Sequence, residues 1–389
     1  MRSAFRFAAL CLAIACSSQA TTPWDDASTP FVTVSTGTIH TCGLIPAGVA
    51  HCWGGNGGAL GDGTTTERLT PMAVVMPAGV TFTSVSAGGG HSCGLTPAGA
   101  AYCWGYNVDG QVGDGTTTDR LTPMAVALPT GLSFASIGGG EYHTCGLTPA
   151  GAAHCWGDNQ YGQLGDGTTT DRLTPTAVAA PAGVTFTSLA VGWVHSCGLT
   201  PAGAAYCWGN NADGEVGDGT TTERLTPTTV AIPAGVTFTT LAVGIIHTCG
   251  LTPEGATYCW GANHRGRLGD GTTTNRLTPV AVAMPAGLTF TSVSAGYAHT
   301  CGLTPAGAVY CWGRNVFGEL GDGTTTNRLT PTAVVMPAGV TFTSLAVGYV
   351  HSCGLTPAGA AYCWGANGGG RLGDGTTTNR LTPVKVVQP

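Results

Sequence analysis

The sequence predicts an all-β fold, a seven-bladed β-propeller with four-stranded antiparallel blades. A segment typified by GYAHTCGLTPAGAVYCWG (Gly296–Gly313) recurs seven times, and its first cysteines are spaced 51 residues once and then 52 residues five times. Each repeat contains four strand-like segments, and no helical periodicity is visible beyond the first twenty residues. Repeats of about 40–50 residues with four strands each are typical of propellers. A tandem solenoid is the alternative architecture.

The first twenty residues have the features of a secretory signal peptide. Arg2 and Arg6 precede an apolar run, and a small-residue cleavage motif ends at Ala20. The sequence leaves open cleavage after Ala20 or lipidation of Cys16, which ends a lipoprotein-like Ala-Ile-Ala-Cys run. Either route exports the protein in bacterial style to the periplasm, the cell surface or the medium. Export agrees with a chain rich in paired cysteines.

The remaining chain divides into a short linker and the repeats. Residues 21–30 are expected to be a polar linker, and residues 31–389 the propeller. Within a repeat, Thr289–Gly296 typifies the first strand, His299–Trp312 the hairpin of the second and third strands, and Thr278–Pro285 the fourth strand. A long polar loop containing GDGTTT joins the third strand to the fourth. The chain starts with the first strand type and ends with the fourth, so the sequence does not settle how the ring closes.

The repeated hairpin predicts a disulfide within each blade. Pro305 and Gly307 supply the turn, and pairing outward from that turn places Cys301 opposite Cys311. Opposed residues in an antiparallel pair are close enough for a disulfide. Zinc coordination by His299 with the two cysteines, and free buried thiols, are the alternatives. The seven predicted disulfides are Cys42–Cys52, Cys93–Cys103, Cys145–Cys155, Cys197–Cys207, Cys249–Cys259, Cys301–Cys311 and Cys353–Cys363.

These motifs resemble the regulator of chromosome condensation (RCC1-like) repeat family. Its hallmark is G-x-x-H-S/T-x-x-L, a short turn, and W-G-x-N-x-x-G-Q-L-G-x-G, and the third repeat reads GEYHTCGLTPAGAAHCWGDNQYGQLGDG (Gly140–Gly167). The resemblance covers Phe31 to the C-terminus, and it implies a seven-bladed propeller and an exported bacterial member. The family includes a nucleotide exchange factor for a nuclear GTPase, a plant ultraviolet receptor and a secreted bacterial inhibitor of β-lactamases. The resemblance therefore implies no single function.

The repeats differ from one another mainly in two loops. One variable set lies between the Gly and the His that begin the hairpin, and the other surrounds the Asn after Trp-Gly. In an antiparallel blade the first and third connections lie on one face of the disc, and the constant TPAG turns lie on the other. Variable loops on a rigid scaffold often carry binding residues, with neutral drift as the alternative. The candidate partner-binding residues are Tyr106, Asp109, Glu141, Tyr142, Asp158, Tyr161, Trp193, Asp213, Glu215, His264, Arg265, Arg267, Tyr297, Arg314, Phe317, Tyr349 and Arg371.

Charge is distributed unevenly around the ring, although the net formal charge is only −6. Apart from the Asp and Arg common to every GDG loop, repeats one to four carry Glu67, Asp109, Asp119, Glu141, Asp158, Asp171, Asp213, Glu215 and Glu223. Repeats five to seven carry Arg265, Arg267, Arg314, Arg371 and Lys385 against Glu254 and Glu319. An acidic half and a basic half would orient a protein partner. The neighbouring aromatic side chains are expected either to anchor that partner or to fill the central channel.

The sequence predicts a binding module that is not an enzyme and needs no cofactor or metal. It contains no G-x-S-x-G motif, P-loop or paired catalytic carboxylates. Each repeat histidine is expected to hydrogen-bond within its own blade, and each GDG aspartate to stabilise its turn. Net negative charge disfavours nucleic acid, and a lipid on Cys16 is the suggested membrane attachment. A carbohydrate-binding module, or a lyase or hydrolase with a site on the same face, remains the alternative to a protein-binding module.

Overall fold

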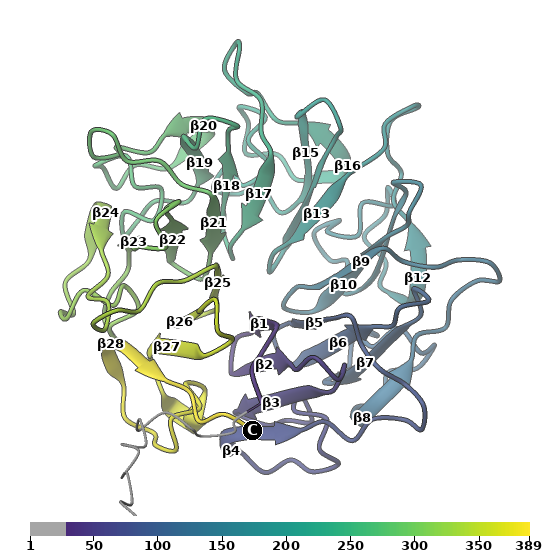
Figure 1. Cartoon of the computed structure of the whole chain (residues 1–389). Coiled ribbons are helices and arrows are strands. Elements are labelled where there is room, and N and C mark those ends of the chain that lie inside the picture. The colour runs from purple at the N-terminus through teal and green to yellow at the C-terminus, as the bar shows by residue number, and fades with distance from the viewer. Residues whose placement is uncertain (1–28) are drawn as a thin grey trace, which may run out of the picture.

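The computed structural model describes residues 29–389 and confirms the predicted seven-bladed propeller (Figure 1). Seven separate four-stranded antiparallel sheets form a closed ring, which excludes the solenoid. Within the described residues, the sole helical element is a single 3₁₀ turn, η1 (Gly368–Gly370). No helix in this part of the chain is long and apolar enough to span a membrane.

Each blade contributes one strand of each type, in chain order from the channel to the rim. The innermost strands are β1 (Thr33–Thr36), β5 (Ser84–Ala87), β9 (Ser136–Gly139), β13 (Ser188–Val191), β17 (Thr240–Val243), β21 (Ser292–Ala295) and β25 (Ser344–Val347). The second strands are β2 (His40–Leu44), β6 (His91–Leu95), β10 (His143–Leu147), β14 (His195–Leu199), β18 (His247–Leu251), β22 (His299–Leu303) and β26 (His351–Leu355). The third strands are β3 (Ala50–Gly54), β7 (Ala101–Gly105), β11 (Ala153–Gly157), β15 (Ala205–Gly209), β19 (Thr257–Gly261), β23 (Val309–Gly313) and β27 (Ala361–Gly365). The outermost strands are β4 (Arg68–Ala73), β8 (Arg120–Ala125), β12 (Arg172–Ala177), β16 (Arg224–Thr229), β20 (Arg276–Ala281), β24 (Arg328–Ala333) and β28 (Arg380–Lys385).

The second and third strands of each blade form the predicted hairpin. In the sixth blade Cys301 pairs with Cys311 and Gly302 with Tyr310, and the turn glycine Gly307 has a φ of 78°. All seven predicted disulfides are present, each with a Cα–Cα distance of 4.1 Å. Because these sulfurs are bonded to one another, the zinc and free-thiol alternatives are excluded.

The hydrophobic core is divided among the spaces between neighbouring blades. Trp104 of the second blade is fully buried in a cluster with Leu60 and Val74 of the first blade. Its ring stacks on Phe82 with centroids 6.0 Å apart, and its Nε1 donates a hydrogen bond of 2.9 Å to the carbonyl of Ala59. The tryptophan of the Trp-Gly motif therefore packs one blade against the blade before it. Truncating such a side chain typically costs about 3–5 kcal/mol.

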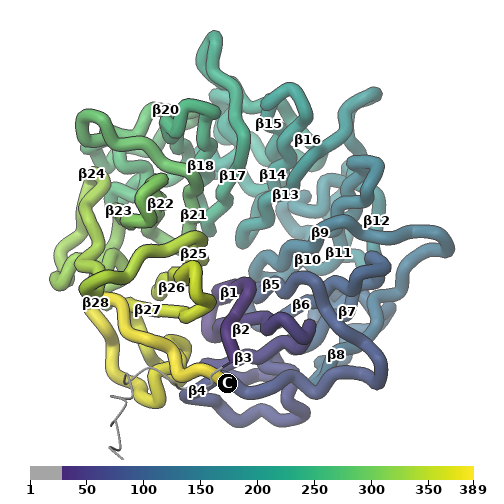
Figure 2. Tube along the Cα trace, viewed as in Figure 1, coloured from purple at the N-terminus to yellow at the C-terminus, as the bar shows by residue number. Residues whose placement is uncertain are grey.

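The ring closes through this same interface, without exchange of a strand. The last strand, β28, completes the seventh blade, and β1 belongs wholly to the first. Phe31 and Trp53 of the first blade pack in one cluster with Leu355 and Leu372 of the seventh. The backbone N–H of Phe31 donates to the carbonyl of Gly359 over 2.9 Å. The first and last blades lie side by side in Figure 2, where purple meets yellow.

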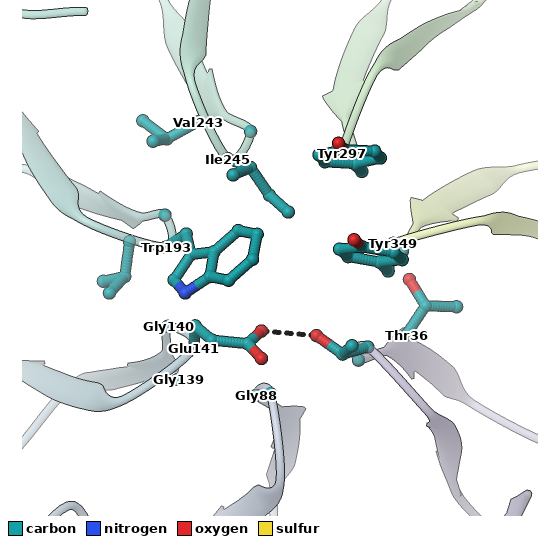
Figure 3. A pocket seen from close by; sticks show the side chains of 18 of the residues that line it. Thr36, Gly88, Gly139, Gly140, Glu141, Trp193, Val243, Ile245, Tyr297 and Tyr349 are labelled. Atoms are coloured by element: carbon teal, nitrogen blue, oxygen red, sulfur yellow. Dashed lines mark hydrogen bonds between the residues drawn. The ribbon is translucent and has the colours of Figure 1, made fainter. Parts of the chain in front are cut away.

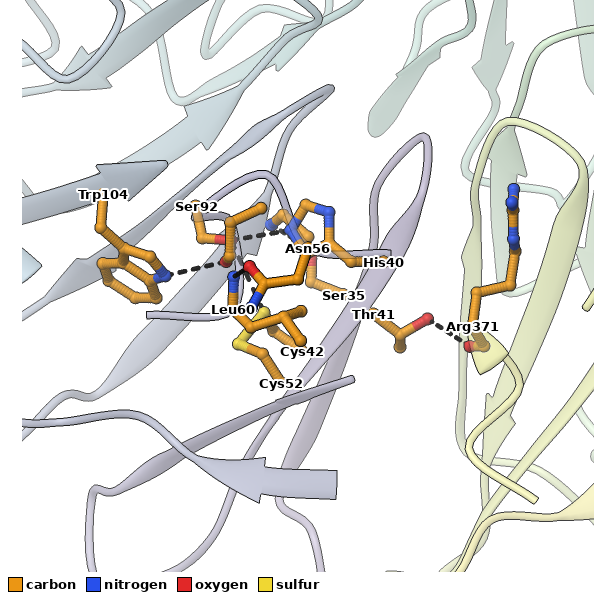
Figure 4. Close-up of a disulfide and its surroundings, with 12 residues drawn as sticks. Ser35, His40, Thr41, Cys42, Cys52, Asn56, Leu60, Ser92, Trp104 and Arg371 are labelled. Carbon is orange, nitrogen blue, oxygen red and sulfur yellow. Dashed lines mark hydrogen bonds between the residues drawn. A yellow bond between two sulfur atoms is a disulfide. The ribbon is translucent and has the colours of Figure 1, made fainter. Parts of the chain in front are cut away.

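The seven repeat histidines connect neighbouring blades, which corrects the expectation that each bonds within its own blade. In every case the imidazole Nε2 lies 2.8–2.9 Å from a Ser or Thr hydroxyl of the next blade (Figure 4 shows the first). The pairs are His40–Ser92, His91–Thr144, His143–Ser196, His195–Thr248, His247–Thr300, His299–Ser352 and His351–Thr41. They form a closed circuit of buried inter-blade contacts.

The GDG aspartate holds the loop between the third and fourth strands, as expected. Oδ1 of Asp270 accepts hydrogen bonds from the backbone N–H and the hydroxyl of Thr272, and Oδ2 lies 2.7 Å from Nη2 of Arg276. Burial alone would raise the pKa of Asp270, but the bonds from Thr272 and Arg276 outweigh it and lower the pKa. Nδ2 of Asn263 also donates to this carboxylate, over 3.0 Å. The variable residues are therefore carried on a fixed loop frame.

Candidate functional site

The two variable loops of each blade lie on the same face of the disc. In the first blade the N–H of Gly55, which begins the loop after β3, donates to the carbonyl of Ile39 in the loop after β1 over 2.9 Å. Ala262 and Ile246 make the equivalent bond of 2.8 Å in the fifth blade. The TPAG turns lie at the opposite ends of these strands. We call the side that carries both variable loops the loop face, and the side that carries the TPAG turns the turn face.

Seven residues that follow the innermost strands converge at the mouth of the central channel (Figure 3). Tyr297 and Tyr349 stack with ring centroids 4.4 Å apart, and Trp193 meets Tyr349 edge-on at 6.0 Å. The cavity that these residues border has a volume of about 100 Å³. Three predicted anchor residues thus narrow the channel while keeping part of their surface exposed. We call this group the channel plug: Thr38, Gly89, Glu141, Trp193, Ile245, Tyr297 and Tyr349.

One hydrogen bond spans the plug. The hydroxyl of Thr38 in the first blade donates to the carboxylate of Glu141 in the third. In Figure 3 this bond is the dashed line that ends at Glu141. Burial raises the pKa of Glu141, and the bond from Thr38 acts in the opposite direction. The carboxyl group is therefore fixed in position at the centre of the loop face.

The basic part of the loop face is built around Arg314. Its Cζ atom lies 4.9 Å from the ring centroid of Phe317 and 5.8 Å from that of Tyr297. Its Nη1 lies 3.0 Å from Oε1 of Glu319, whose side chain is fully buried while that of Arg314 is 15% exposed. Stacking of a guanidinium on aromatic rings contributes roughly 0.5–2 kcal/mol, depending on exposure. Arg314, Tyr297 and Phe317 therefore form one rigid group.

Two other predicted basic contacts, Arg267 and Arg371, serve mainly to hold the loops. Arg267 is only 3% exposed, and its Nη1 donates to the carbonyl of Tyr297 over 3.2 Å. Burial lowers the pKa of Arg267 to about 10. Arg371 donates through Nη1 to the carbonyl of Thr38 over 3.0 Å, and through Nε and Nη2 to that of Gly368. Each arginine thus reaches from one blade to the loop of the next.

The predicted acidic residues also divide into supporting and partly exposed groups. Asp158 is 8% exposed, and its carboxylate accepts a bond of 2.8 Å from Nε2 of Gln163. Asp109 is half-buried, and its pKa is raised by burial and by the neighbouring charges of Asp158 and Asp171. Tyr106 and Tyr142 pack edge-on beside this group with centroids 6.3 Å apart. Asp109, Tyr106 and Tyr142 thus form a group on the loop face whose side chains keep part of their surface exposed.

Glu215 lies beneath the loop face, which corrects its assignment as a partner contact. It is 1% exposed, and its Oε2 accepts a bond of 2.9 Å from the backbone N–H of Asp213. Burial raises the pKa of Glu215 to about 7. Gln111 and Gln163 make the same bond in the second and third blades. In these blades the Gln or Glu side chain serves the same N–H group, so the variation between Gln and Glu does not indicate binding.

The other predicted residues lie farther out on the loop face. His264 and Arg265 are exposed, Tyr161 is partly exposed, and Asp213 accepts a bond of 2.8 Å from Nδ2 of Asn275. Cys16 lies outside the described residues.

Sequence reasoning missed Thr38, Gly89 and Ile245 in the plug, and Val316, which is 44% exposed two residues after Arg314. All four occupy the variable sets, but they carry neither charge nor an aromatic ring. Their variation between repeats was the one signal that could have identified them.

Comparison with known proteins agrees with this geometry. Models of the regulator of chromosome condensation (RCC1) repeat match residues 47–95, 98–147, 150–199, 202–251, 254–303, 306–355 and 358–389. The Ultraviolet-B receptor UVR8 of Arabidopsis thaliana is 31% identical over 357 residues, which cover 91% of this chain and 81% of the receptor. The human E3 ubiquitin-protein ligase HERC2 is 29% identical over 350 residues, and this chain spans only 7% of its length.

A solved structure shows the same fold at lower sequence identity. Prp20p from Saccharomyces cerevisiae superposes with a TM-score of 0.77 at 22% identity, and the match covers 92% of this chain and 88% of Prp20p. Seven matched repeats, seven blades and an extended alignment to UVR8 agree with one another. The chain therefore belongs to the regulator of chromosome condensation (RCC1) repeat family.

Proposed function

We propose that this protein is an exported, non-catalytic binding module that engages a protein partner through its loop face. The observation that carries the proposal is the concentration of partly exposed Arg and aromatic side chains there, above all Arg314 with Tyr297 and Phe317. Arg, Tyr and Trp are the residues most often found at energetic centres of protein interfaces. Because Glu319 and the two rings fix Arg314, little side-chain entropy remains to be lost on binding.

The arrangement of charge supports a protein partner in a defined orientation. Asp109 and the exposed Asp119 and Asp171 lie in the second and third blades, and Arg265 and Arg314 in the fifth and sixth. A partner of complementary polarity would be steered into one rotational setting on the disc. Binding of Gsp1p and histones is reported for Prp20p, which has the same fold.

Carbohydrate is less well supported than protein as the ligand of this face. The rings of Tyr297 and Tyr349 stack on each other, and Trp193 meets Tyr349 edge-on. A sugar ring would need an open aromatic face, which this packing reduces.

Export is part of the proposal. Residues 1–20 would be the signal peptide and residues 21–30 the linker, with cleavage after Ala20 or lipidation of Cys16. Seven buried disulfides indicate an oxidising environment, because cytosolic thiols are normally kept reduced. Mass spectrometry of the mature N-terminus distinguishes the two routes, and a cytoplasmic protein with an intact N-terminus would overturn export.

Site-specific crosslinking tests which face binds. A photo-crosslinking phenylalanine analogue is placed at Val316 on the loop face, and in a matched variant at Ala306 in an exposed TPAG turn on the turn face. We expect a protein adduct from Val316 and none from Ala306, and the captured protein should bind again when purified. Adducts formed equally from both positions, or only from Ala306, would overturn the assignment of the binding face.

A further inference from the structure

We propose that a groove beside the channel plug recognises a peptide segment in which acidic side chains flank a large apolar side chain. The groove, which we call the Arg314 groove, has a volume of about 430 Å³. Its lining includes Ile39, Tyr297, Arg314, Phe317, Val350 and Arg371. This inference rests on the proposed function and specifies the chemistry of the partner at one subsite.

The groove brings together residues from three consecutive blades around the ring. Tyr297, Arg314 and Phe317 come from the sixth blade, Val350 and Arg371 from the seventh, and Ile39 from the first. No single repeat could have built it, because the other repeats lack this combination of residues. The groove is therefore an individual feature of a ring whose scaffold is repeated.

Apolar surface forms one part of the groove. Tyr297 is stacked on Tyr349 with centroids 4.4 Å apart, which fixes its ring. Phe317, Ile39 and the almost fully buried Val350 add apolar area from neighbouring loops. A groove of this size, mostly apolar with a few fixed polar groups, is typical of specific ligand sites.

Two guanidinium groups supply the charge. Arg314 uses Nη1 to contact Glu319, and within residues 29–389 no hydrogen bond occupies its other N–H groups. Glu319 is fully buried below Arg314, so its carboxylate is not presented to the groove. Arg371 is held by the carbonyls of Thr38 and Gly368. Among residues 29–389 it forms no ion pair, although the charge of the nearby Glu67 acts to raise its pKa. The groove therefore presents positive charge beside apolar surface.

The cationic character extends beyond the groove. The Cζ atoms of Arg267 and Arg314 lie 6.0 and 5.8 Å from the centroid of the same Tyr297 ring. Arg265 is exposed nearby in the fifth blade. A guanidinium binds a carboxylate through a planar fork, and pre-positioning that fork reduces the entropy lost on binding. Charge complementarity thus favours an acidic peptide as the occupant.

Calorimetry with short peptides tests the proposal. The probe is N-acetyl-Gly-Asp-Glu-Phe-Asp-Gly-amide, whose blocked ends leave side-chain carboxylates as its sole charges. The matched probes are the Asn-Gln-Phe-Asn analogue, which lacks charge, and the Asp-Glu-Ala-Asp analogue, which lacks the ring. We expect both analogues to bind the full chain at least tenfold more weakly than the parent peptide. Added salt should weaken the binding of the parent peptide.

Variants of the protein locate the contact. R314Q should weaken binding of the parent peptide at least tenfold, and K385Q, which removes a charge from the outermost strand β28, should leave it unchanged. Since R314Q leaves Glu319 buried without its partner, the double variant R314Q/E319Q is made as well. Gln is compatible with position 319, because Gln111 and Gln163 occupy it in other blades.

The outcomes separate this inference from the proposed function. Equal binding of the charged and uncharged peptides, or unchanged binding to both Arg314 variants, overturns the acidic-peptide site. If crosslinking at Val316 still captures a partner, loop-face binding stands without the groove. If the peptide binds as expected but the captured partner joins the turn face, the proposed function falls and the groove stands as a peptide site.

Discussion

The imidazole Nε2 of His40 lies 2.8 Å from the hydroxyl oxygen of Ser92, which belongs to the next blade. That hydroxyl donates in turn to the carbonyl of Ala59 over 2.9 Å, so the imidazole is the donor to Ser92. The circuit ends with His351 and Thr41, whose atoms lie 2.9 Å apart across the closure of the ring. Because all seven imidazoles are buried, contact between blades is linked to their protonation.

Acid should destabilise the fold before the Asp–Arg pairs titrate. Burial, with a smaller effect of nearby positive groups, lowers the pKa of His40 to about 3, and burial lowers that of His91 to about 4. In the unfolded chain a histidine has a pKa of about 6.5. Between that pH and the lower pKa values of the folded protein, the unfolded state binds more protons. The stability from neutral imidazoles is therefore complete above the unfolded pKa and is lost as pH falls from there toward the folded values.

Thermal unfolding followed from pH 8 to 4 measures this effect. Seven such groups give a slope of at most about 9.5 kcal/mol per pH unit in the free energy of unfolding. We expect the melting temperature to fall steeply between about pH 6 and pH 4. A melting temperature that stays level over this range would contradict a buried neutral histidine circuit.

Removing one hydroxyl from the circuit should destabilise the ring. Thr248 accepts from Nε2 of His195 and donates to the carbonyl of Glu215 over 3.1 Å. T248V keeps the shape but leaves Nε2 of His195 unpaired, while the carbonyl of Glu215 still accepts from Nε1 of Trp260 over 2.9 Å. We therefore expect a loss of about 1–3 kcal/mol in chemical denaturation. The matched control T229V changes an exposed residue of β16 and should have little effect. Equal effects of the two variants would show that the bond is not important.

Replacing Glu215 should stabilise the protein at alkaline pH. Its folded pKa of about 7 lies above its unfolded value, so ionising it in the buried site opposes folding increasingly as pH rises toward 7. E215Q preserves the acceptor for Asp213 N–H and removes the charge, and we expect a gain of about 2–3 kcal/mol at pH 8 and little change at pH 4.

The control for this prediction is E319Q at the equivalent position of the sixth blade. Burial also raises the pKa of Glu319, but its ion pair with Arg314 acts in the opposite direction. Losing its charge should therefore bring a clearly smaller gain. A stabilisation of E319Q that equals that of E215Q would show that the pairing is unimportant.

Each disulfide should contribute separately to stability. Removing Cys249–Cys259 by the double substitution C249A/C259A opens a loop with a sequence separation of 10 residues. A loop of this size corresponds to about 2–3 kcal/mol on the chain-entropy estimate. Urea denaturation measures the loss, and peptide mapping without reduction should still find the other six pairs. Cross-pairing between blades would contradict the hairpin register.

The sequence predicted the local structure because each signal had a local cause. The turn at Pro305 and Gly307 fixed the hairpin register, and that register placed Cys301 opposite Cys311. The partners of the histidines could not be found this way. Their partners lie 52 or 53 residues away, as in His40–Ser92, which is about one repeat. Every repeat offers the same Ser or Thr, so periodicity alone cannot tell whether a histidine bonds to its own blade or to the next.

The candidate site was predicted less completely, because variation between repeats does not report burial. Glu215 and Arg267 differ between repeats as strongly as the exposed Arg265, yet both lie beneath the loops. Their position is occupied by Ala59 in the first blade, by Gln or Glu in four blades and by Arg in two. The Gln or Glu side chain accepts from the N–H group two residues earlier, whereas the Arg side chain bonds to the next blade. Hydrogen-bond geometry, which becomes visible only in the folded ring, separates supporting residues from exposed ones.

The affinity of the crosslinked partner for two matched variants tests the central claim most directly. W193A/R265Q alters the loop face, whereas E254A alters an exposed residue in a turn on the opposite face. With both variants shown to fold by their melting temperatures, W193A/R265Q should weaken partner binding at least tenfold, and E254A should leave it unchanged. Undiminished binding by W193A/R265Q, together with loss of binding by E254A, would contradict docking through the loop face.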